Sequence, residues 1–221
     1  MNIRLIMRAI TARNKTQPED SVKKALKKIG GNIFLDVGAN VGDYTILLLR
    51  NFSKVIALEP NPQTVVALKN RLQSEDKKPL VVESALADFD GETKFYLNQD
   101  TARASGSADT LEAKFHYRPA SNPNLEKSDW KHKEITVKVQ RLDSLVQTFS
   151  GSIDLVKIDV EGAEFRVLKG AEKTLSAGRI RRILIELHDR TRKEELENLL
   201  SNNRFSCRWL DADHIFGELK Q

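Results

Sequence analysis

Short apolar runs alternate along the chain with segments in which apolar residues recur every three or four positions. Residues 33–37, Ile-Phe-Leu-Asp-Val, form the clearest run, and residues 54–58 and 153–158 repeat the pattern. Continuous apolar runs of this length are typical of parallel strands that are buried on both faces. The helical patterns that follow these runs predict helices at 44–51, 63–73 and 163–175. Repeated strand–helix units indicate an α/β fold with a mostly parallel sheet.

Further elements follow from the same patterns. We expect helices at 19–29, 142–149 and 193–202, and strands at 79–85, 94–97, 134–140 and 179–187. Residues 205–210 and 215–219 flank a polar turn after the last helix and predict a hairpin, which adds antiparallel strands. One domain is expected over 1–221, with a helical extension at 1–30. Residues 98–133 are polar and irregular, and a compact domain rarely contains such a stretch unless it is a lid, a binding loop or disordered. We expect a substrate lid there; the alternative is a mobile surface loop.

The composition is that of a globular protein in a reducing compartment. Hydrophobic residues make up 40% of the 221 residues and charged residues 30%, which is enough for a sizeable core. Cys207 is the single cysteine, so we expect no internal disulfide and a cytoplasmic location. No apolar run reaches the ~18 residues of a spanning helix, and residues 1–10 are too short and interrupted for a signal peptide. The net charge of +5 permits a nucleic-acid partner without requiring one.

The most informative stretch is the glycine-rich turn after the first strand. Its spacing is D-x-G-x-x-x-G, with Asp36 at the strand tip and Gly38 and Gly42 in the turn. Glycine lets the backbone approach a ligand closely, and the following helix presents free N–H groups. A dinucleotide site has the spacing G-x-G-x-x-G, and a carboxylate here would repel a pyrophosphate. We therefore expect a cationic ligand such as S-adenosylmethionine, which has a sulfonium and an amino group; the alternative is an ordinary turn capped by Asp36.

Acidic residues also end other strands, at the sheet edge where open α/β sheets bind ligands. Glu59 ends the second strand, and a carboxylate there suits the two hydroxyls of a ribose. The alternative for Glu59 is an acid at the start of the helix that begins near Pro60 and Pro62. Asn61 would orient Glu59 or contact the ribose itself.

Six segments together resemble the FkbM family of methyltransferases over about residues 32–188. They have the family's order and spacing: FLDVGANVGDYT, ALEPNP, ESALADFDG, RLDSL, VKIDVEGAEFRVLKGA and LIELH. The resemblance implies a Rossmann-like class I methyltransferase fold, with a mostly parallel seven-stranded sheet, an antiparallel C-terminal hairpin and helices on both faces. It also implies S-adenosylmethionine as cofactor and O-methylation of a hydroxyl on a small molecule, natural product or sugar.

The resemblance also implies which residues contact the cofactor. They share a place at the carboxyl ends of the first three strands: Asp36, Gly38, Asn40, Gly42, Glu59, Asn61, Ala85 and Leu86. The first four would hold the methionine part of the cofactor, and Glu59 would hold its ribose. The loop of Ala85 and Leu86 would flank the adenine.

Asp159, Glu161 and His188 are the candidates for catalytic groups. Asp159 and Glu161 would line the transfer site, where Asp159 would bind the donor's amino group or an acceptor hydroxyl. His188 ends a strand on the same side and is the best candidate for the base that a hydroxyl nucleophile needs. A carboxylate at position 161 is also simply favourable at a helix N-terminus, and an isolated histidine is more often structural. Glu164 and Glu172 are expected to be solvent-exposed helix charges.

We predict no tight metal site. Asp159, Glu161, Glu186 and His188 could together bind a divalent cation through oxygen and imidazole ligands. No H-x-x-H pattern or cysteine cluster supports such a site.

Two other functions remain open from the sequence. The basic clusters at 23–28 and 179–182 would suit an RNA methyltransferase with the same core. A non-catalytic binding protein could also retain this fold. The preferred partner is a small-molecule or glycan acceptor, and the sequence does not predict the oligomeric state.

Overall fold

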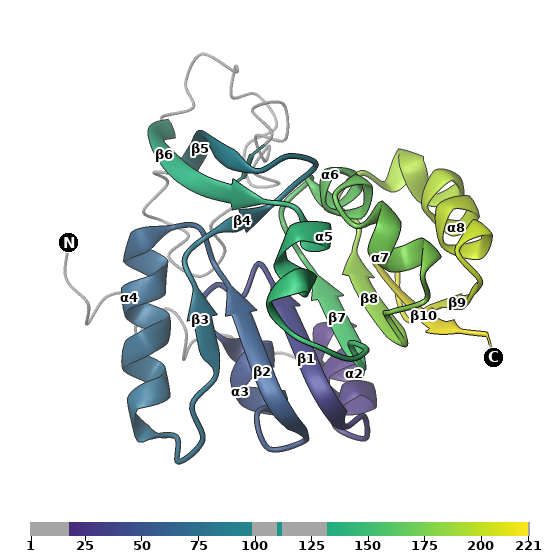
Figure 1. Ribbon diagram of the computed structural model, residues 1–221, viewed down its shortest axis with the longest axis horizontal. Coiled ribbons are helices and arrows are strands. Elements are labelled where there is room, and N and C mark those ends of the chain that lie inside the picture. The colour runs from purple at the N-terminus through teal and green to yellow at the C-terminus, as the bar shows by residue number, and fades with distance from the viewer. Residues whose placement is uncertain (1–17, 99–109, 112–131, 221) are drawn as a thin grey trace.

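The computed structural model describes residues 18–98, 110–111 and 132–220. Within them, a seven-stranded sheet has the order β3-β2-β1-β7-β8-β10-β9 (Figure 1). Its strands are β1 (Gly31–Val37), β2 (Phe52–Leu58), β3 (Leu80–Val82), β7 (Leu155–Ile158), β8 (Arg182–Glu186), β9 (Phe205–Trp209) and β10 (His214–Leu219). The first five strands in this list are parallel, and β10 is antiparallel to both β8 and β9. The mostly parallel sheet with its antiparallel hairpin confirms the predicted fold class.

Helices cover both faces of the sheet, because successive strand residues point to opposite sides. Phe34 and Leu35 of β1 are fully buried, and they belong to the hydrophobic clusters of opposite faces. One face carries α2 (Pro18–Leu26), α3 (Asp43–Leu48) and α4 (Pro62–Arg71), and the other carries α5 (Leu142–Leu145), α6 (Glu164–Lys169), α7 (Glu172–Ser176) and α8 (Lys193–Asn202). Short 3-10 turns occupy Leu72–Ser74, Val146–Thr148 and Arg190–Arg192.

A second, smaller sheet lies beyond the carboxyl ends of the parallel strands (Figure 1). It contains β4 (Ala85–Leu86), β6 (His132–Gln140) and β5 (Gly91–Asn98), with β4 parallel and β5 antiparallel to β6. The strands predicted at 94–97 and 134–140 lie here rather than in the main sheet. The sequence analysis did not anticipate this separate sheet.

Two predicted segments fall largely outside the described residues. The predicted extension at 1–30 is described from Pro18 onward. Within the predicted lid at 98–133, the structure describes Thr110 and Leu111 in addition to the ends of β5 and β6. The extension and the lid therefore stay predictions.

The prediction of one helix over 163–175 is wrong, because the structure contains two helices, α6 and α7. The backbone of Gly170, between them, lies against Ala87, and a Cβ at residue 170 would be 1.9 Å from the carbonyl oxygen of Ala87. The carboxylate of Asp143 then accepts hydrogen bonds from the backbone N–H and the hydroxyl of Thr174, at 2.9 and 2.7 Å. The N–H groups in the first turn of a helix have no partner within the helix. The carboxylate of Asp143 accepts that of Thr174 and so stabilises the start of α7 as a separate helix.

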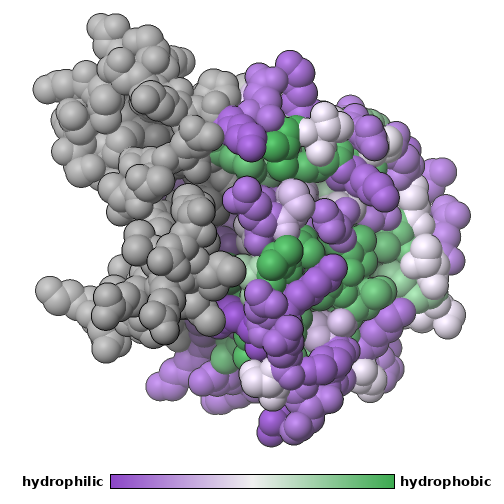
Figure 2. Space-filling model, turned by 90° about the vertical axis from the view of Figure 1, so that its left-hand side faces the viewer, coloured by the Kyte–Doolittle hydropathy of each residue, from purple (hydrophilic) through white to green (hydrophobic). Residues whose placement is uncertain are grey.

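The face of the molecule that carries α4 and β3 is mostly hydrophilic, with hydrophobic areas among the polar ones (Figure 2). Val66 of α4 and Leu80 of β3 are the exposed large hydrophobic side chains of the described residues, at 55% and 51%. No helix in the described part of the chain has the length and apolar character that crossing a bilayer requires.

Asp154 joins the beginnings of β1, β7 and β8, at the end of the sheet opposite the small sheet. One of its oxygens accepts hydrogen bonds from the backbone N–H groups of Asn32 and Ile33, at 2.7 and 3.1 Å. The other is 3.0 Å from a nitrogen of Arg181. Because Asp154 is only 4% exposed, water cannot easily replace these contacts.

We expect Asp154→Ala to lower the free energy of unfolding by about 1–3 kcal/mol, because the buried N–H of Ile33 and the partly buried N–H of Asn32 lose their acceptor. Urea denaturation followed by circular dichroism measures this change. Asp76→Ala is the matched control, since the Asp76 side chain is 96% exposed and its removal should change stability by less than about 0.5 kcal/mol. Equal stability of the two variants would contradict the assignment.

His214 connects the C-terminal hairpin to β8. It pairs with Glu186 in the strand register, and its Nε2 is 3.2 Å from the Glu186 carboxylate. Its Nδ1 is 2.9 Å from Asp211. Burial alone would lower the pKa of His214, but the hydrogen bonds and charges of Glu186 and Asp211 raise it to about 9. The protonated imidazole therefore stabilises the folded chain.

This raised pKa predicts a pH dependence of stability. The folded pKa of His214, about 9, lies above the ordinary value of 6.5, so its contribution is complete below about pH 6.5 and is lost as the pH rises to about 9. We expect the unfolding free energy of the parent to fall by roughly 1–3 kcal/mol over this range relative to His214→Gln. Urea denaturation at several pH values tests this, and parallel pH profiles for the two proteins would refute it.

Candidate active site

Gly38 allows the turn after β1 to pack directly against the end of β7. Its φ is 74°, and a Cβ there would lie 1.8 Å from the carbonyl oxygen of Asp159. Asn40 and Gly42 also have positive φ, at 49° and 90°, a conformation that glycine and asparagine tolerate best. The N–H groups of Gly38 and Ala39 donate to the carbonyl oxygen at the end of β2, at 3.1 and 2.9 Å. The turn is thus fixed over the carboxyl ends of three neighbouring strands.

Asp36 is fully buried beneath this turn, and its charge is compensated inside the protein. One oxygen of Asp36 accepts a hydrogen bond from the Thr45 hydroxyl at 2.6 Å, and the other is 3.5 Å from Nζ of Lys157. The same Nζ is 3.2 Å from Asp159 and donates to the carbonyl oxygen of Gly38 at 2.9 Å. Burial would lower the pKa of Lys157, but the charges of Asp159 and Asp36 outweigh it and raise the pKa. Lys157 is therefore a fixed ammonium.

Glu59 lies at the end of β2, where two loops hold its carboxylate. One oxygen accepts the backbone N–H of Asn40 and the other accepts that of Asn61, both at 2.9 Å. Asn61 also caps α4, because its side-chain oxygen accepts the N–H of Gln63 at 3.0 Å. A carboxylate can accept several hydrogen bonds, so these two contacts orient Glu59 without preventing it from accepting more.

A cavity of about 610 Å³ opens above these strand ends. Its wall contains residues of the first turn, the small sheet and the end of β7: Val37, Gly38, Asn40, Glu59, Pro60, Thr64, Ser84, Ala85, Leu86, Phe95, Leu111, Asp159, Val160 and Glu161. The volume includes space that is open to solvent at the mouth, so the lining residues rather than the size indicate what the cavity binds.

Most of the predicted site residues line this cavity, and four do not. Asp36, Gly42, Asn61 and His188 lie behind the wall or beside it. Gly42 instead precedes α3 in a left-handed conformation, next to Leu68. The sequence analysis missed the part of the wall that comes from Thr64, Phe95 and Leu111. Phe95 belongs to β5 of the small sheet, which no sequence pattern indicated, so no local signal placed Phe95 at the cavity.

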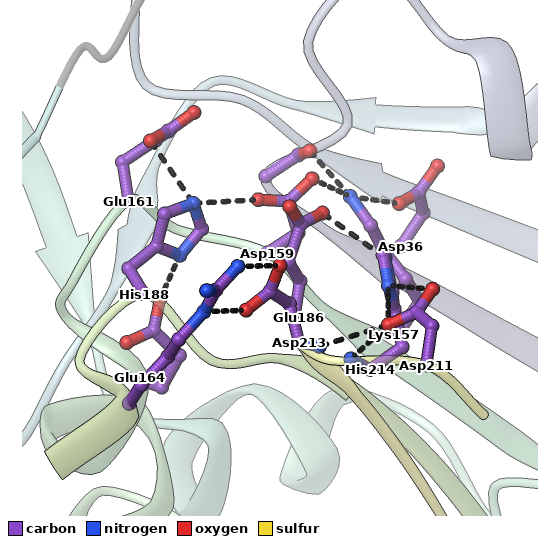
Figure 3. A network of polar contacts seen from close by, with 12 residues as sticks. Asp36, Lys157, Asp159, Glu161, Glu164, Glu186, His188, Asp211, Asp213 and His214 are labelled. Atoms are coloured by element: carbon purple, nitrogen blue, oxygen red, sulfur yellow. Dashed lines mark hydrogen bonds and ion pairs between the residues drawn. The ribbon is translucent and has the colours of Figure 1, made fainter. Parts of the chain in front are cut away.

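An acidic cluster surrounds His188 at the β7 end of the cavity (Figure 3). Nε2 of His188 is 3.0 Å from the carboxylate of Glu161 and 3.9 Å from that of Asp159. Nδ1 is 2.9 Å from the carboxylate of Glu164. The structure thus brings together the three residues that were predicted to be catalytic.

The prediction that Glu164 is solvent-exposed is wrong, because Glu164 is only 1% exposed. One of its oxygens contacts His188 and also accepts the backbone N–H of Gly162, at 2.9 Å in both cases. Its position in the first turn of α6 is typical of an ordinary helix charge. Its partner His188 follows β8, whereas Glu164 follows β7, so no local sequence pattern indicates the pairing.

These carboxylates change the protonation of His188. Burial would lower its pKa, but hydrogen bonds to Glu161 and Glu164 and the charge of Asp159 raise it to about 12. Burial raises the pKa of Glu161. Burial would also raise the pKa of Asp159, but the charge of Lys157 outweighs it and lowers that pKa. His188 therefore carries a proton at neutral pH in this arrangement and cannot accept another. Its role as a base stays a prediction, which requires that a bound group change these contacts.

Glu161 has an unusual backbone, with a φ of 52°. This left-handed conformation is unfavourable for a residue with a Cβ. The Thr110 hydroxyl donates to the carbonyl oxygen of Glu161 at 2.7 Å, and Thr110 is 1% exposed. Thr110 in turn pairs with Tyr96 of β5. The small sheet therefore helps to hold the turn that carries Glu161.

Known proteins share this sequence pattern and fold. Residues 36–212 match the family described as the methyltransferase FkbM domain. The 2-O-methyltransferase NoeI of Sinorhizobium fredii is 28% identical over 152 residues, which are 66% of this chain and 60% of NoeI. The hexuronic acid methyltransferase AglP of Haloferax volcanii is 24% identical over 193 residues, 84% of this chain and 70% of AglP.

A solved structure gives the same result for the fold. The crystal structure of a methyltransferase FkbM from Methylobacillus flagellatus superposes with a TM-score of 0.57 and 15% identity, over 98% of this chain and 58% of that one. The chain thus spans about 60% of the length of NoeI and of this structure. The family match covers most of the chain and confirms the resemblance seen in its motifs. The chain belongs to the FkbM methyltransferase domain family.

Proposed function

We propose that this chain transfers a methyl group from S-adenosylmethionine to a hydroxyl oxygen of a sugar or another small molecule. The proposal rests on one observation: a single cavity connects the oriented carboxylate of Glu59 with the acidic end of β7. Family membership supports the reaction class. The name of NoeI, a 2-O-methyltransferase, supports an oxygen as the methyl acceptor, and the name of AglP, a hexuronic acid methyltransferase, supports a sugar acid as the acceptor molecule.

The cavity fits the donor. Because residue 38 has no Cβ, the turn packs directly against Asp159, and both residues line the cavity. The carboxylate of Glu59 would accept hydrogen bonds from the ribose hydroxyls. Leu86 and Phe95 of the small sheet supply an apolar wall for the adenine. Bound S-adenosylmethionine would supply a methyl group on a positively charged sulfur.

Asp36 acts on the donor indirectly in this proposal. It lies behind the cavity wall and holds Lys157, which positions Asp159 and the carbonyl oxygen of Gly38. The carboxylates of Asp159 and Glu161, which line the cavity, would hold the acceptor hydroxyl or the donor's amino group. The contribution of these groups is alignment, because methyl transfer requires the nucleophile in line with the breaking bond.

The proposed function predicts two measurable activities. Isothermal titration calorimetry should detect S-adenosylhomocysteine binding to the purified chain. Incubation with S-adenosylmethionine and a panel of hexoses and hexuronic acids should yield a methyl ether that mass spectrometry detects. A folded chain that does not bind S-adenosylhomocysteine at millimolar concentration would refute S-adenosylmethionine as the methyl donor. Methylation of RNA without methylation of any sugar would show that the acceptor is a nucleic acid.

Glu59 and Asp36 should differ in what their removal changes. Glu59→Ala should weaken S-adenosylhomocysteine binding by about 1.5–3 kcal/mol, roughly 10- to 150-fold, because hydrogen bonds to a charged group are lost. Asp36→Ala should mainly lower the free energy of unfolding, by about 1–3 kcal/mol, because a buried partner of Lys157 is lost. Calorimetry and urea denaturation separate the two effects. The exposed Glu172→Ala serves as control, and larger loss of affinity in Asp36→Ala than in Glu59→Ala would contradict these roles.

A further inference from the structure

Three side chains of the candidate active site converge on one point. A carboxylate oxygen of Asp159, one of Glu161 and a ring nitrogen of His188 all lie within 4.8 Å of one another. We propose that these three side chains bind one divalent cation, and that the cation holds the acceptor hydroxyl during methyl transfer. The cation site is inferred from the described side chains alone, whereas its use in transfer rests on the proposed function.

The orientation of His188 is the first argument. Nδ1 of His188 is held at 2.9 Å by Glu164, whose oxygen is itself fixed by the N–H of Gly162. Nε2 consequently points toward Glu161 and Asp159 (Figure 3). Histidines that bind metals almost always have their second nitrogen bound to a carboxylate or carbonyl, which fixes the ring. The buried carboxylate of Glu164 supplies this feature.

The charge of the network is the second argument. Four carboxylates contact the ammonium of Lys157 or the imidazole of His188, and they belong to Asp36, Asp159, Glu161 and Glu164. Even with the imidazole of His188 protonated, four carboxylates against two cations leave this network with a net negative charge. Uncompensated negative charge is costly in a partly buried site. A divalent cation at the convergence point compensates it.

Access from the cavity is the third argument. Asp159 and Glu161 line the cavity, and the three side chains keep exposed fractions of 21% to 32%. An ion with three protein ligands keeps open positions for water or substrate. These open positions would face the cavity, where the acceptor hydroxyl must lie.

The ligand atoms also restrict the kind of ion. Two carboxylates with one imidazole are a mixed oxygen and nitrogen set, which suits ions such as Mn²⁺ better than thiolate-preferring ions. The sequence pattern grouped Glu186 with these residues, but its carboxylate is 3.2 Å from Nε2 of His214 instead. The prediction of no tight metal site rested on the absence of sequential metal motifs. It did not consider that Glu164 anchors His188.

A cation in this position accounts for activation of the acceptor without a free base. Metal binding lowers the pKa of a bound oxygen group, as it does for water. The acceptor O–H bond breaks and its proton passes to solvent. The oxygen then bonds to the methyl carbon while the carbon–sulfur bond breaks, and that electron pair goes to sulfur. The products are a methyl ether, S-adenosylhomocysteine and a proton, so atoms and charge balance.

Titration of the EDTA-treated full chain with Mn²⁺, followed by electron paramagnetic resonance of the free ion, tests the site. We expect saturable binding of one Mn²⁺ per chain. Glu161→Gln should weaken binding because a ligand charge is lost. Glu164→Gln should weaken it roughly 10- to 100-fold, because the ring of His188 loses its anchor. The matched control is Glu186→Gln, a carboxylate at the same sheet edge, which should leave Mn²⁺ affinity unchanged.

Circular dichroism and urea denaturation establish that each variant is folded. A folded parent without saturable Mn²⁺ binding at millimolar concentration overturns the cation site. Unchanged affinity in Glu161→Gln, or a loss in Glu186→Gln as large as that in Glu161→Gln, also overturns it.

Measurements of methyl transfer test the role of the cation separately from the proposed function. Methyl transfer should fall after EDTA treatment and return with Mn²⁺. Full activity in the EDTA-treated chain would refute the cation's role in transfer and leave the methyltransferase proposal intact. Mn²⁺ binding without S-adenosylhomocysteine binding would refute the proposed function and leave the cation site intact.

Discussion

The buried ammonium of Lys157 is the constraint on which the candidate active site depends. Lys157 lies opposite Asp36 in the register of β7 and β1, and its side chain is 4% exposed. A charge that is so well shielded from water is stable only with close partners. Lys157 finds them in Asp36, in Asp159 and in the carbonyl oxygen of Gly38. One side chain thus fixes the end of β1, the glycine turn and Asp159 relative to one another.

This arrangement divides the acidic residues at the sheet edge into two groups. Asp36 lies outside the cavity wall and forms an ion pair with Lys157, and its contact with a cationic ligand stays a prediction. Glu59 has its carboxylate held by backbone N–H groups of two loops at the cavity wall. These donors fix the direction in which the Glu59 carboxylate points. Glu59 also lines the cavity, whereas Asp36 does not.

The sequence predicted those features that short-range patterns report. The apolar run at 33–37 identified a strand buried on both faces, because period and length reflect burial. The acids after the strands identified the edge of the sheet at which the cavity lies, because parallel strands end together. The sequence did not reveal the pairing of Lys157 with Asp36, or of Glu164 with His188. Both pairs join residues of separate strand–helix units, and each partner on its own looks like an ordinary charged residue.

The same limitation explains why the contribution of the small sheet to the site was missed. Thr110 pairs with β5 and donates to the carbonyl oxygen of Glu161, whose φ of 52° is unfavourable for a residue with a side chain. Such a conformation persists only where the surroundings impose it. Here the hydroxyl of Thr110 holds one side of the turn, and the bond from Gly162 to Glu164 holds the other. The carboxylate of Glu161, which lines the cavity, is therefore aimed at His188 by contacts from two segments that are distant in the sequence.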